Sequence, residues 1–492
     1  MLLPDSLPKR QHTVLAFVLI LAAAFLRFYH LDGQSIWNDE MFTIDVARLA
    51  FGDIQPALVK NFHHPPLYFY LVHAVFVIAG ESLYTLRFLS AFFGTLTVWA
   101  VFRFTASRWN WKGGAIAGII CCVSPFHLAY SQEGRPYALA AFLALMGCHF
   151  FLRVIETGNR GSLTAYIITT LALLYTHHWG IFIVCAQGVS LIIDARNSRA
   201  GMKKFLIAAG IILLLYLPEL PALKHQSASG GSAVWWWVEP PNANEALELS
   251  GAFSGTHFKM ASSVFDSSVT AKFMGAGSLA IILFLSLFHL FSSGKDRSFR
   301  YLSTISIGAL IIPIGLSFAK PEVFLWYRHT LIIYPLACVG MGAAYAVARW
   351  RIAIALCAGI LILLGADGAR RYYSWSKSNI REVASYVEEV TRAEKIILIR
   401  PAYVAPMLNY YYSGSAIQMD EAYLNTSLGM VVDTARSFVY VSLDVPNEIR
   451  TYMDGHFDKP AEKVFPGTAH MGLIVGVYKQ KPEIEEEESE EK

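Results

Sequence analysis

Two carboxylates stand side by side shortly after the first apolar segment of the chain. Asp39 and Glu40 follow Asn38, a good helix-capping residue, and the sequence up to Gly52 has apolar side chains at helical spacing. We expect a helix that begins at Asp39, ends just before Gly52 and lies on the membrane surface, with its acidic end near lipid head groups. A carboxylate there could take a proton from a hydroxyl group. Alternatively, both acids only complement the positive end of the helix.

Two further segments place polar groups beside apolar runs. His64 opens the sequence His-Pro-Pro-Leu, where the prolines set the entry to a helix. The segment Tyr130-Ser-Gln-Glu-Gly-Arg-Pro-Tyr137 holds Glu133 and Arg135 at membrane depth or just above it. Ionisable groups are costly at that depth, which favours a functional interpretation. The alternatives are a helix start with aromatic interface anchors for the first segment, and a Glu133–Arg135 pair that joins two helices for the second.

Other candidate residues lie at the ends of apolar segments. Arg27 and Arg87 could face the same region, or could extend their guanidinium groups to the interface. Arg328, within Trp326-Tyr-Arg-His329, could meet a phosphate group. The adjacent His177 and His178 leave open a divalent cation held with a carboxylate, but we assign no metal ligands and no certain cofactor.

The composition identifies a lipid-embedded protein. Of the 492 residues, 55% are hydrophobic and 16% are charged, whereas soluble domains carry about 25% charged residues. A net charge of +3 is too small to indicate a nucleic-acid partner. All six cysteines lie inside apolar runs, so disulfides and thiolate zinc sites are not expected.

Eleven apolar segments could cross a bilayer, which needs about 20 residues each. They lie near 13–29, 84–105, 113–130, 135–154, 162–177, 179–194, 204–221, 272–291, 301–318, 329–348 and 351–367. A further segment, 67–79, reaches only roughly 20 Å as a helix, short of a hydrocarbon core of about 30 Å. We therefore expect 67–79 to be an interfacial helix.

The basic residues support this choice. With the N-terminus inside and 67–79 not spanning, the lysines and arginines of five loops all fall on the inner side, as the positive-inside rule requires. We predict a multi-pass protein of the inner (plasma) membrane with a cytoplasmic N-terminus. Residues 30–83, residues 222–271 and everything after about 370 then lie outside. Cleavage of 13–29 as a signal peptide would not change these sides.

Three domains follow from the change in composition along the chain. Residues 1–370 form the transmembrane domain, 371–480 an extracytoplasmic α/β domain and 481–492 a disordered acidic tail. Within the second we expect a helix at 379–392 and strands at 395–400, 437–443 and 472–478. Trp235-Trp236-Trp237 is either a flap over a binding groove or part of the aromatic belt.

The order of motifs resembles a known family. Trp-Asn-Asp-Glu after the first span, His-Pro-Pro-Leu and Ser-Gln-Glu-Gly-Arg-Pro-Tyr are similar to the protein O-mannosyltransferase-like membrane glycosyltransferases. These are bacterial members of glycosyltransferase family 39 and relatives such as the aminoarabinose transferases. The resemblance covers residues 10–220 in motif order. It implies the C-type glycosyltransferase membrane fold and a sugar donor carried on a polyprenyl phosphate.

The resemblance also implies roles for individual residues. Asp39 matches the catalytic acidic position, with Glu40 as its partner, and His64 falls in a motif near the active site. We interpret Asp39 as a general base. The leaving phosphate would be neutralised by Arg135, with Arg87 or Arg328 as helpers. Glu133 would orient Arg135 or bind sugar hydroxyls, and Tyr137 of the same turn would join the donor-binding residues.

Two departures from the family bear on the acceptor. Tyr68-Phe69 follow His-Pro-Pro-Leu where protein O-mannosyltransferases have Gly-Lys, and 222–271 shows no β-trefoil insert. A protein acceptor of the eukaryotic type is therefore not favoured, and an envelope lipid, glycan or protein stays open. The competing hypotheses are a polytopic transporter, a polymerase or ligase of lipid-linked glycans, and a non-catalytic receptor.

Overall fold

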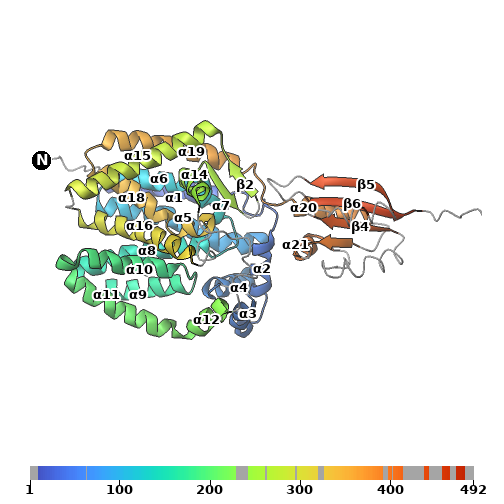
Figure 1. The fold of residues 1–492 in the computed structure, drawn as a ribbon, viewed down its shortest axis with the longest axis horizontal. Coiled ribbons are helices and arrows are strands. Elements are labelled where there is room, and N and C mark those ends of the chain that lie inside the picture. Colours follow the sequence, from blue (N-terminus) through green and yellow to red (C-terminus); the bar gives the residue numbers. More distant parts are fainter. Residues whose placement is uncertain are drawn as a thin grey trace, which may run out of the picture. The chain divides into compact units, whose positions relative to one another are not determined.

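The structure of the chain is a computed structural model (Figure 1). The structure describes residues 9–61, 64–228, 242–260, 263–293, 296–319, 326–391, 397–401, 403–413, 437–442, 451, 457–465 and 473–481. By their contacts, these residues divide into two compact units. The first unit contains most of the chain up to Trp375, and the second contains Gly33–Phe42, Ala261–Val264 and Ser376–Lys492.

The first unit is built from long apolar helices. They are α1 (Lys9–Phe28), α5 (Leu83–Arg108), α6 (Trp111–Val123), α7 (Pro125–Ser131), α8 (Tyr137–Thr157), α9 (Arg160–Leu174), α10 (Gly180–Ile193), α11 (Ala195–Tyr216), α15 (Val269–Ser293), α16 (Arg297–Ser317), α18 (Tyr334–Val347) and α19 (Arg351–Tyr372). Between them lie shorter elements: α3 (Ile54–Asn61), α4 (Leu67–Ala79), α12 (Leu220–Ala228), α14 (Ala243–Ser254), α17 (Trp326–His329) and the single turns η1 (Phe51–Asp53), η2 (Leu217–Glu219) and η4 (Thr330–Ile332).

Each of the eleven predicted spans coincides with helix. Six described helices are long and apolar enough to cross a membrane, or seven if α6 and α7 form one span. Five shorter apolar helices accompany them, including α9, α10 and α18. The protein is therefore a mostly helical, multi-pass membrane protein, as predicted, although length and composition support fewer spans than eleven. Helix α4 has 13 residues, which agrees with the short segment expected at 67–79.

The first loop departs from the prediction. The helix expected to reach Gly52 ends at Ala47 as α2 (Asn38–Ala47), and η1 and α3 follow it. The reason is a side chain from α4: His73 Nδ1 donates to the Ala47 carbonyl at 2.9 Å. That carbonyl thus bonds an imidazole instead of a backbone N–H one turn further on, and Ala50 turns to an extended conformation (φ −59°, ψ 147°).

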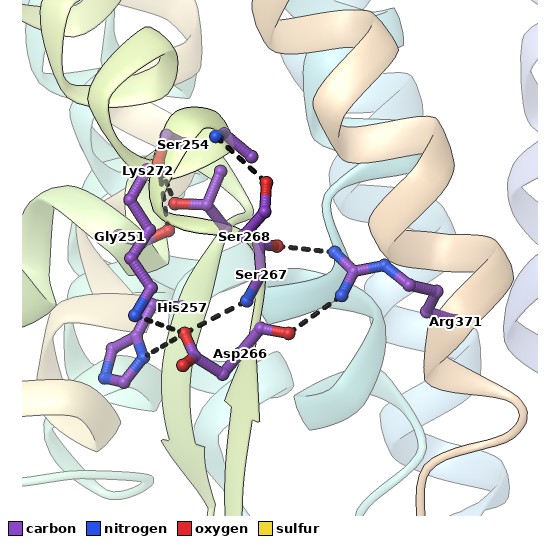
Figure 2. A network of polar contacts seen from close by, with 10 residues as sticks. Gly251, Ser254, His257, Asp266, Ser267, Ser268, Lys272 and Arg371 are labelled. Atoms are coloured by element: carbon purple, nitrogen blue, oxygen red, sulfur yellow. Dashed lines mark hydrogen bonds and ion pairs between the residues drawn. The ribbon is translucent and has the colours of Figure 1, made fainter.

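The second long loop is tied to the helices by a polar network (Figure 2). It contains the strands β1 (His257–Met260) and β2 (Ser263–Asp266). Asp266 bonds Lys272 of α15 at 2.5 Å and His257 at 3.1 Å. Arg371 of α19 donates to the Asp266 carbonyl at 2.8 Å and to Ser267 Oγ at 2.5 Å. The end of the loop is therefore anchored to α15 and α19. The flap proposed at 235–237 lies outside the described residues.

The second unit contains a four-stranded mixed sheet in the order β3-β4-β6-β5. Strands β3 (Ile397–Arg400), β4 (Ser437–Ser442) and β6 (Leu473–Gln480) lie where the sequence predicted strands. Helix α20 (Ile380–Val390) confirms the amphipathic helix, since it buries Ile380, Val383, Ala384 and Val387 along one stripe. The predicted acidic tail at 481–492 falls, after Lys481, outside the described residues.

Sequence reasoning missed strand β5 (Phe457–Phe465) and helix α21 (Val404–Tyr411). The β5 sequence, FDKPAEKVF, holds a proline and four charges in place of alternating apolar residues. It is an edge strand, paired only with β6 among the described strands and irregular between Asp458 and Ala461. Edge strands tolerate proline and charge because one side needs no hydrogen-bonding partner.

Candidate functional site

A break between α6 and α7 comes shortly before residues 132–136, the turn between α7 and α8 that carries Arg135 (the Arg135 turn). The two helices are bent by 61° at Ser124, so the segment predicted as one span, 113–130, is not straight. Pro125 has no N–H to donate to the Cys121 carbonyl, one turn earlier. Ser124 caps the new helix, because its side chain accepts from the His127 N–H at 3.2 Å. The bend therefore follows directly from Ser-Pro at this point.

Arg27 of α1 supplies the hydrogen bonds that the break removes. Its guanidinium is fully buried and donates to the carbonyls of Cys121 at 3.2 Å and Cys122 at 3.3 Å. It also donates to His127 Nδ1 at 2.9 Å. Arg27 therefore does not extend to the interface, which was one of the two interpretations open from the sequence. It is a structural cation that stabilises the bend.

Gln132, the residue after α7, also joins α7 to the end of α1. Gln132 Nε2 donates to the carbonyls of Arg27 at 3.0 Å and Tyr29 at 2.8 Å, where α1 ends. Arg87 of α5 is also fully buried and donates to the Leu31 carbonyl at 3.0 Å. Together these bonds hold the segment after α1 against α5 and α7. Arg87 thus has a backbone partner for at least one of its nitrogens.

Arg135 is the central member of the polar residues that the sequence motifs identified. Its side chain is 3% exposed. One guanidinium nitrogen bonds His64 Nε2 at 2.7 Å and another donates to Thr43 Oγ1 at 3.3 Å. The backbone is fixed too, since Ser90 Oγ donates to the Arg135 carbonyl at 3.1 Å. An arginine only donates hydrogen bonds, so His64 Nε2 is the acceptor and the imidazole is neutral.

Histidine and tyrosine rings surround this arginine from four segments. The His177 ring lies 5.7 Å from that of His64, 5.6 Å from that of Tyr137 and 5.1 Å from that of His329. The turns that carry them are joined where the Leu67 N–H donates to the Tyr175 carbonyl at 2.9 Å. Sequence segments more than 100 residues apart therefore meet here.

The electrostatics favour neutral imidazoles and leave a donor available. Burial lowers the pKa of His64 well below its usual range, and the Arg135 guanidinium lowers it further. Burial, followed by the neighbouring His329, does the same to the pKa of His177. The Trp179 N–H donates to His177 Nδ1 at 3.2 Å, which places the ring proton on Nε2. Within the described part of the chain, this buried Nε2 has no hydrogen-bond partner.

The remaining predicted residues of the turn and of α17 also lie in the first unit. Glu133 is fully buried beside Arg135, whose N–H donates to the Glu133 carbonyl at 2.7 Å. Tyr137 begins α8 and packs its ring 5.3 Å from that of Tyr130. Arg328 lies on α17 next to His329 and is partly exposed. The structure thus brings His64, Glu133, Arg135 and Tyr137 together, with Arg328 adjacent in sequence to a ring of the cluster.

The two carboxylates belong to the second unit. Glu40 is fully buried, and its carboxylate lies 3.6 Å from the equally buried Lys377 Nζ. The preceding segment is held by the same domain: the Lys377 N–H donates to Gln34 Oε1 at 3.0 Å, and Tyr411 Oη accepts from the Ile36 N–H at 2.9 Å. The C-terminal domain therefore fixes the start of α2. Asp39 is partly exposed at that helix start.

The metal hypothesis gains no support from the described residues, among which no group of three or more His, Cys, Asp or Glu side chains could hold an ion. His178 Nδ1 instead bonds Tyr216 Oη at 3.1 Å. Sequence reasoning missed Thr43, Ser90, His329 and Lys377 as partners of the predicted residues. No local signal identifies them, because each partner is remote in the chain.

The comparisons with known proteins agree with the motif resemblance. Residues 63–221 match the model of the family described as dolichyl-phosphate-mannose-protein mannosyltransferase. YycA of Bacillus subtilis (strain 168), a mannosyltransferase by name, is 23% identical over 253 residues, which cover 49% of this chain and 36% of the relative. The match therefore spans about a third of that relative's length.

Solved structures show the fold. The oligosaccharyltransferase AglB of Archaeoglobus fulgidus, solved with an inhibitory peptide and a dolichol-phosphate, aligns with a TM-score of 0.53 at 13% identity, over 96% of this chain and 74% of that one. ArnT of Cupriavidus metallidurans aligns with a TM-score of 0.44 at 11% identity, over 95% and 97% of the two chains. The likeness to AglB shows that the chain has the C-type glycosyltransferase fold. Residues 63–221 are therefore similar to the dolichyl-phosphate-mannose-protein mannosyltransferase family, in agreement with the resemblance that the motifs indicated.

Proposed function

We propose that the protein is a glycosyltransferase that moves a sugar from a polyprenyl-phosphate donor to an envelope acceptor. The observation that carries this proposal is the buried Arg135, which bonds the neutral His64 and Thr43. A buried cation surrounded by neutral imidazoles is suited to an anionic ligand such as a phosphate. The unpartnered His177 Nε2–H offers a further donor. AglB, which shares the fold, was solved with dolichol-phosphate.

Asp39 is the proposed base because it belongs to the Trp-Asn-Asp-Glu motif, whose acidic position is catalytic in the family that the chain resembles. Asp39 precedes Thr43 by four residues in α2, and residues four apart share one helix face. Thr43 accepts the hydrogen bond from Arg135. A carboxylate within hydrogen-bond reach of the acceptor hydroxyl can take up its proton, as a general base must.

The reaction is a single displacement at the anomeric carbon. The acceptor hydroxyl oxygen forms the new bond to that carbon while its proton passes to the Asp39 carboxylate. The bond between the anomeric carbon and the donor phosphate oxygen breaks, and polyprenyl phosphate leaves with the electron pair. Arg135, helped by Arg328 or Arg87, neutralises the phosphate charge, and Glu133 holds the arginine or the sugar hydroxyls. The family resemblance implies inversion at this carbon.

We further propose that the site faces the extracytoplasmic side and that all eleven apolar segments span. Helices shorter than 18 residues can still cross where neighbouring residues extend the apolar stretch or the bilayer thins. With α4 at the interface, the basic residues at or just after the C-terminal ends of α5, α8 and α10 share the inner side, where positive charge is favoured. The Arg135 turn and the C-terminal domain then lie outside, where envelope acceptors are found.

The test is transfer by the purified full-length protein in lipid nanodiscs, supplied with a radiolabelled polyprenyl-phosphate sugar. We expect Asp39→Asn to reduce the release of polyprenyl phosphate at least about a hundredfold, the scale at which general bases contribute. Asp45→Asn is the matched control, because Asp45 is an exposed carboxylate on the same helix. Near-normal release by Asp39→Asn would reject Asp39 as the base. No release by the wild-type protein with any lipid-linked sugar, together with solute uptake, would favour the transporter hypothesis.

A further inference from the structure

A groove lies between α5 and α8, remote from the candidate site. It has a volume of about 190 Å³ and is lined by Trp99, Ala100, Arg103, Phe104 and Ser107 of α5 and by Leu145, Met146 and His149 of α8. Its floor is apolar and buried, since Ala100, Phe104 and Leu145 are each under 5% exposed. Its rim is open, with Trp99 39% exposed. The site is thus an open apolar groove on the lipid-facing side of the helix bundle.

One end of the groove is basic. Arg103 lines it and is exposed, and Arg153 follows His149 by one turn of α8. Arg108 and Arg153 are both close enough to His149 to interact with it electrostatically. Glu156 is the acidic residue near this ring, and its carboxylate already bonds Arg108. The net charge around this end of the groove is therefore positive, which favours an anionic ligand.

The groove reaches the membrane surface opposite the candidate site. Arg87 and Arg103 are 16 residues apart on α5, a rise of about 24 Å. Arg87 lies at the level of the Arg135 turn, so Arg103 lies near the other surface of the bilayer. Phe88, Phe92 and Trp99 of α5 are all exposed and form a lipid-facing stripe that leads to the groove. A ligand that enters here must therefore come from the leaflet at the Arg103 end.

We propose that this groove binds one anionic phospholipid. An acyl chain lies on Ala100, Phe104 and Leu145, and the phosphate group is bound by Arg103 and Arg153. His149 supports this assignment, because its Nδ1 is buried without a hydrogen-bond partner among the described residues and its ring is held edge-on to Phe104 at 5.0 Å. Basic pockets between transmembrane helices are known to recognise lipid head groups. This inference does not depend on the proposed transferase activity.

Native mass spectrometry of the delipidated full-length protein tests the proposal. We expect titration with phosphatidylglycerol to show one bound lipid at concentrations where phosphatidylcholine does not bind. Arg103→Gln/Arg153→Gln should weaken phosphatidylglycerol binding at least about tenfold, because each basic residue contributes to anionic-lipid attraction. Arg199→Gln is the matched control, an exposed arginine near the start of α11. Both changes are at exposed side chains and leave the core intact.

A second variant tests the apolar part of the site. Ala100→Phe places a ring in the groove and should reduce binding of phosphatidylglycerol while an unchanged melting temperature shows that the fold persists. Equal binding of the two lipids by the wild-type protein would overturn the proposal. So would an unaffected Arg103→Gln/Arg153→Gln variant, an equal loss in Arg199→Gln, or displacement of the lipid by inorganic phosphate.

Discussion

Replacing Arg27 by methionine should destabilise the protein and misplace the Arg135 turn. Arg27 donates three hydrogen bonds to α6 and α7, to Cys121, Cys122 and His127. Hydrogen bonds between transmembrane helices contribute about 0.6 kcal/mol on average and up to about 1.7 kcal/mol. Three such bonds predict a loss of roughly 2–5 kcal/mol in the free energy of unfolding. Methionine keeps an unbranched side chain, so packing of the stem is largely retained.

The assay is reversible unfolding in mixed micelles, measured beside sugar transfer by the same preparations. Arg199→Met, a substitution at an exposed arginine, controls for loss of charge alone and should change the unfolding free energy by less than about 0.5 kcal/mol. Arg27→Lys should fall between, because an ammonium group cannot reach both carbonyls with the planar fork of a guanidinium.

Pro125→Ala separates the two consequences of losing Arg27. Alanine restores an N–H that can bond the Cys121 carbonyl, so Arg27→Met/Pro125→Ala should regain part of the lost stability. It should not regain transfer, because a straighter α6–α7 moves the turn that carries Arg135. If the two substitutions prove simply additive in stability, or if the double variant recovers full activity, the assignment of Arg27 as substitute donor for the bend is wrong.

Two further predictions concern charge. Because burial and Arg135 hold the pKa of His64 below its unfolded value of about 6.5, the unfolded chain binds more protons as the pH falls. The melting temperature should therefore drop from about pH 7.5 to about pH 5.5, and by less in His64→Gln. Lys377→Met should cost about 3 kcal/mol in unfolding free energy, because it removes the cation beside the buried Glu40. Adding Glu40→Gln should recover most of this cost. Sugar transfer by the double variant Lys377→Met/Glu40→Gln then shows whether Glu40 has a role in transfer besides anchoring α2.

Local sequence patterns were sufficient wherever structure is decided by neighbours in the chain. The apolar runs became helices, the stripe of α20 became its buried face, and the valine- and isoleucine-rich strands β3, β4 and β6 formed at the expected positions. The early end of α2 was not predictable in this way. It depends on His73, which lies 26 residues further along the chain and whose imidazole gives no sign of its partner in the sequence.

The sequence predicted which residues form the candidate site better than it predicted their hydrogen-bond partners. His64, Glu133, Arg135 and Tyr137 were selected by motif, and the structure brings them together. Their partners come from elsewhere: Arg135 and His64 are 71 residues apart, and His329 lies 152 residues beyond His177. A buried cation such as Arg27 is ambiguous in the same sense, because a sequence cannot distinguish a guanidinium that meets backbone carbonyls from one that meets a ligand.

The bend at Ser124 connects these observations. Pro125 has no N–H to donate to the Cys121 carbonyl, and the buried Arg27 of α1 supplies a donor in its place. A buried cation costs desolvation that an apolar residue would avoid. The bend must therefore be stabilising elsewhere or be required for function. No second proline or glycine in α7 enforces it, and its effect is to direct the next residues back over α1 and α5, where Ser90 fixes the Arg135 carbonyl. We infer that placement of the Arg135 turn offsets the costly helix break, and transfer activity should therefore respond to Arg27 more steeply than stability alone explains.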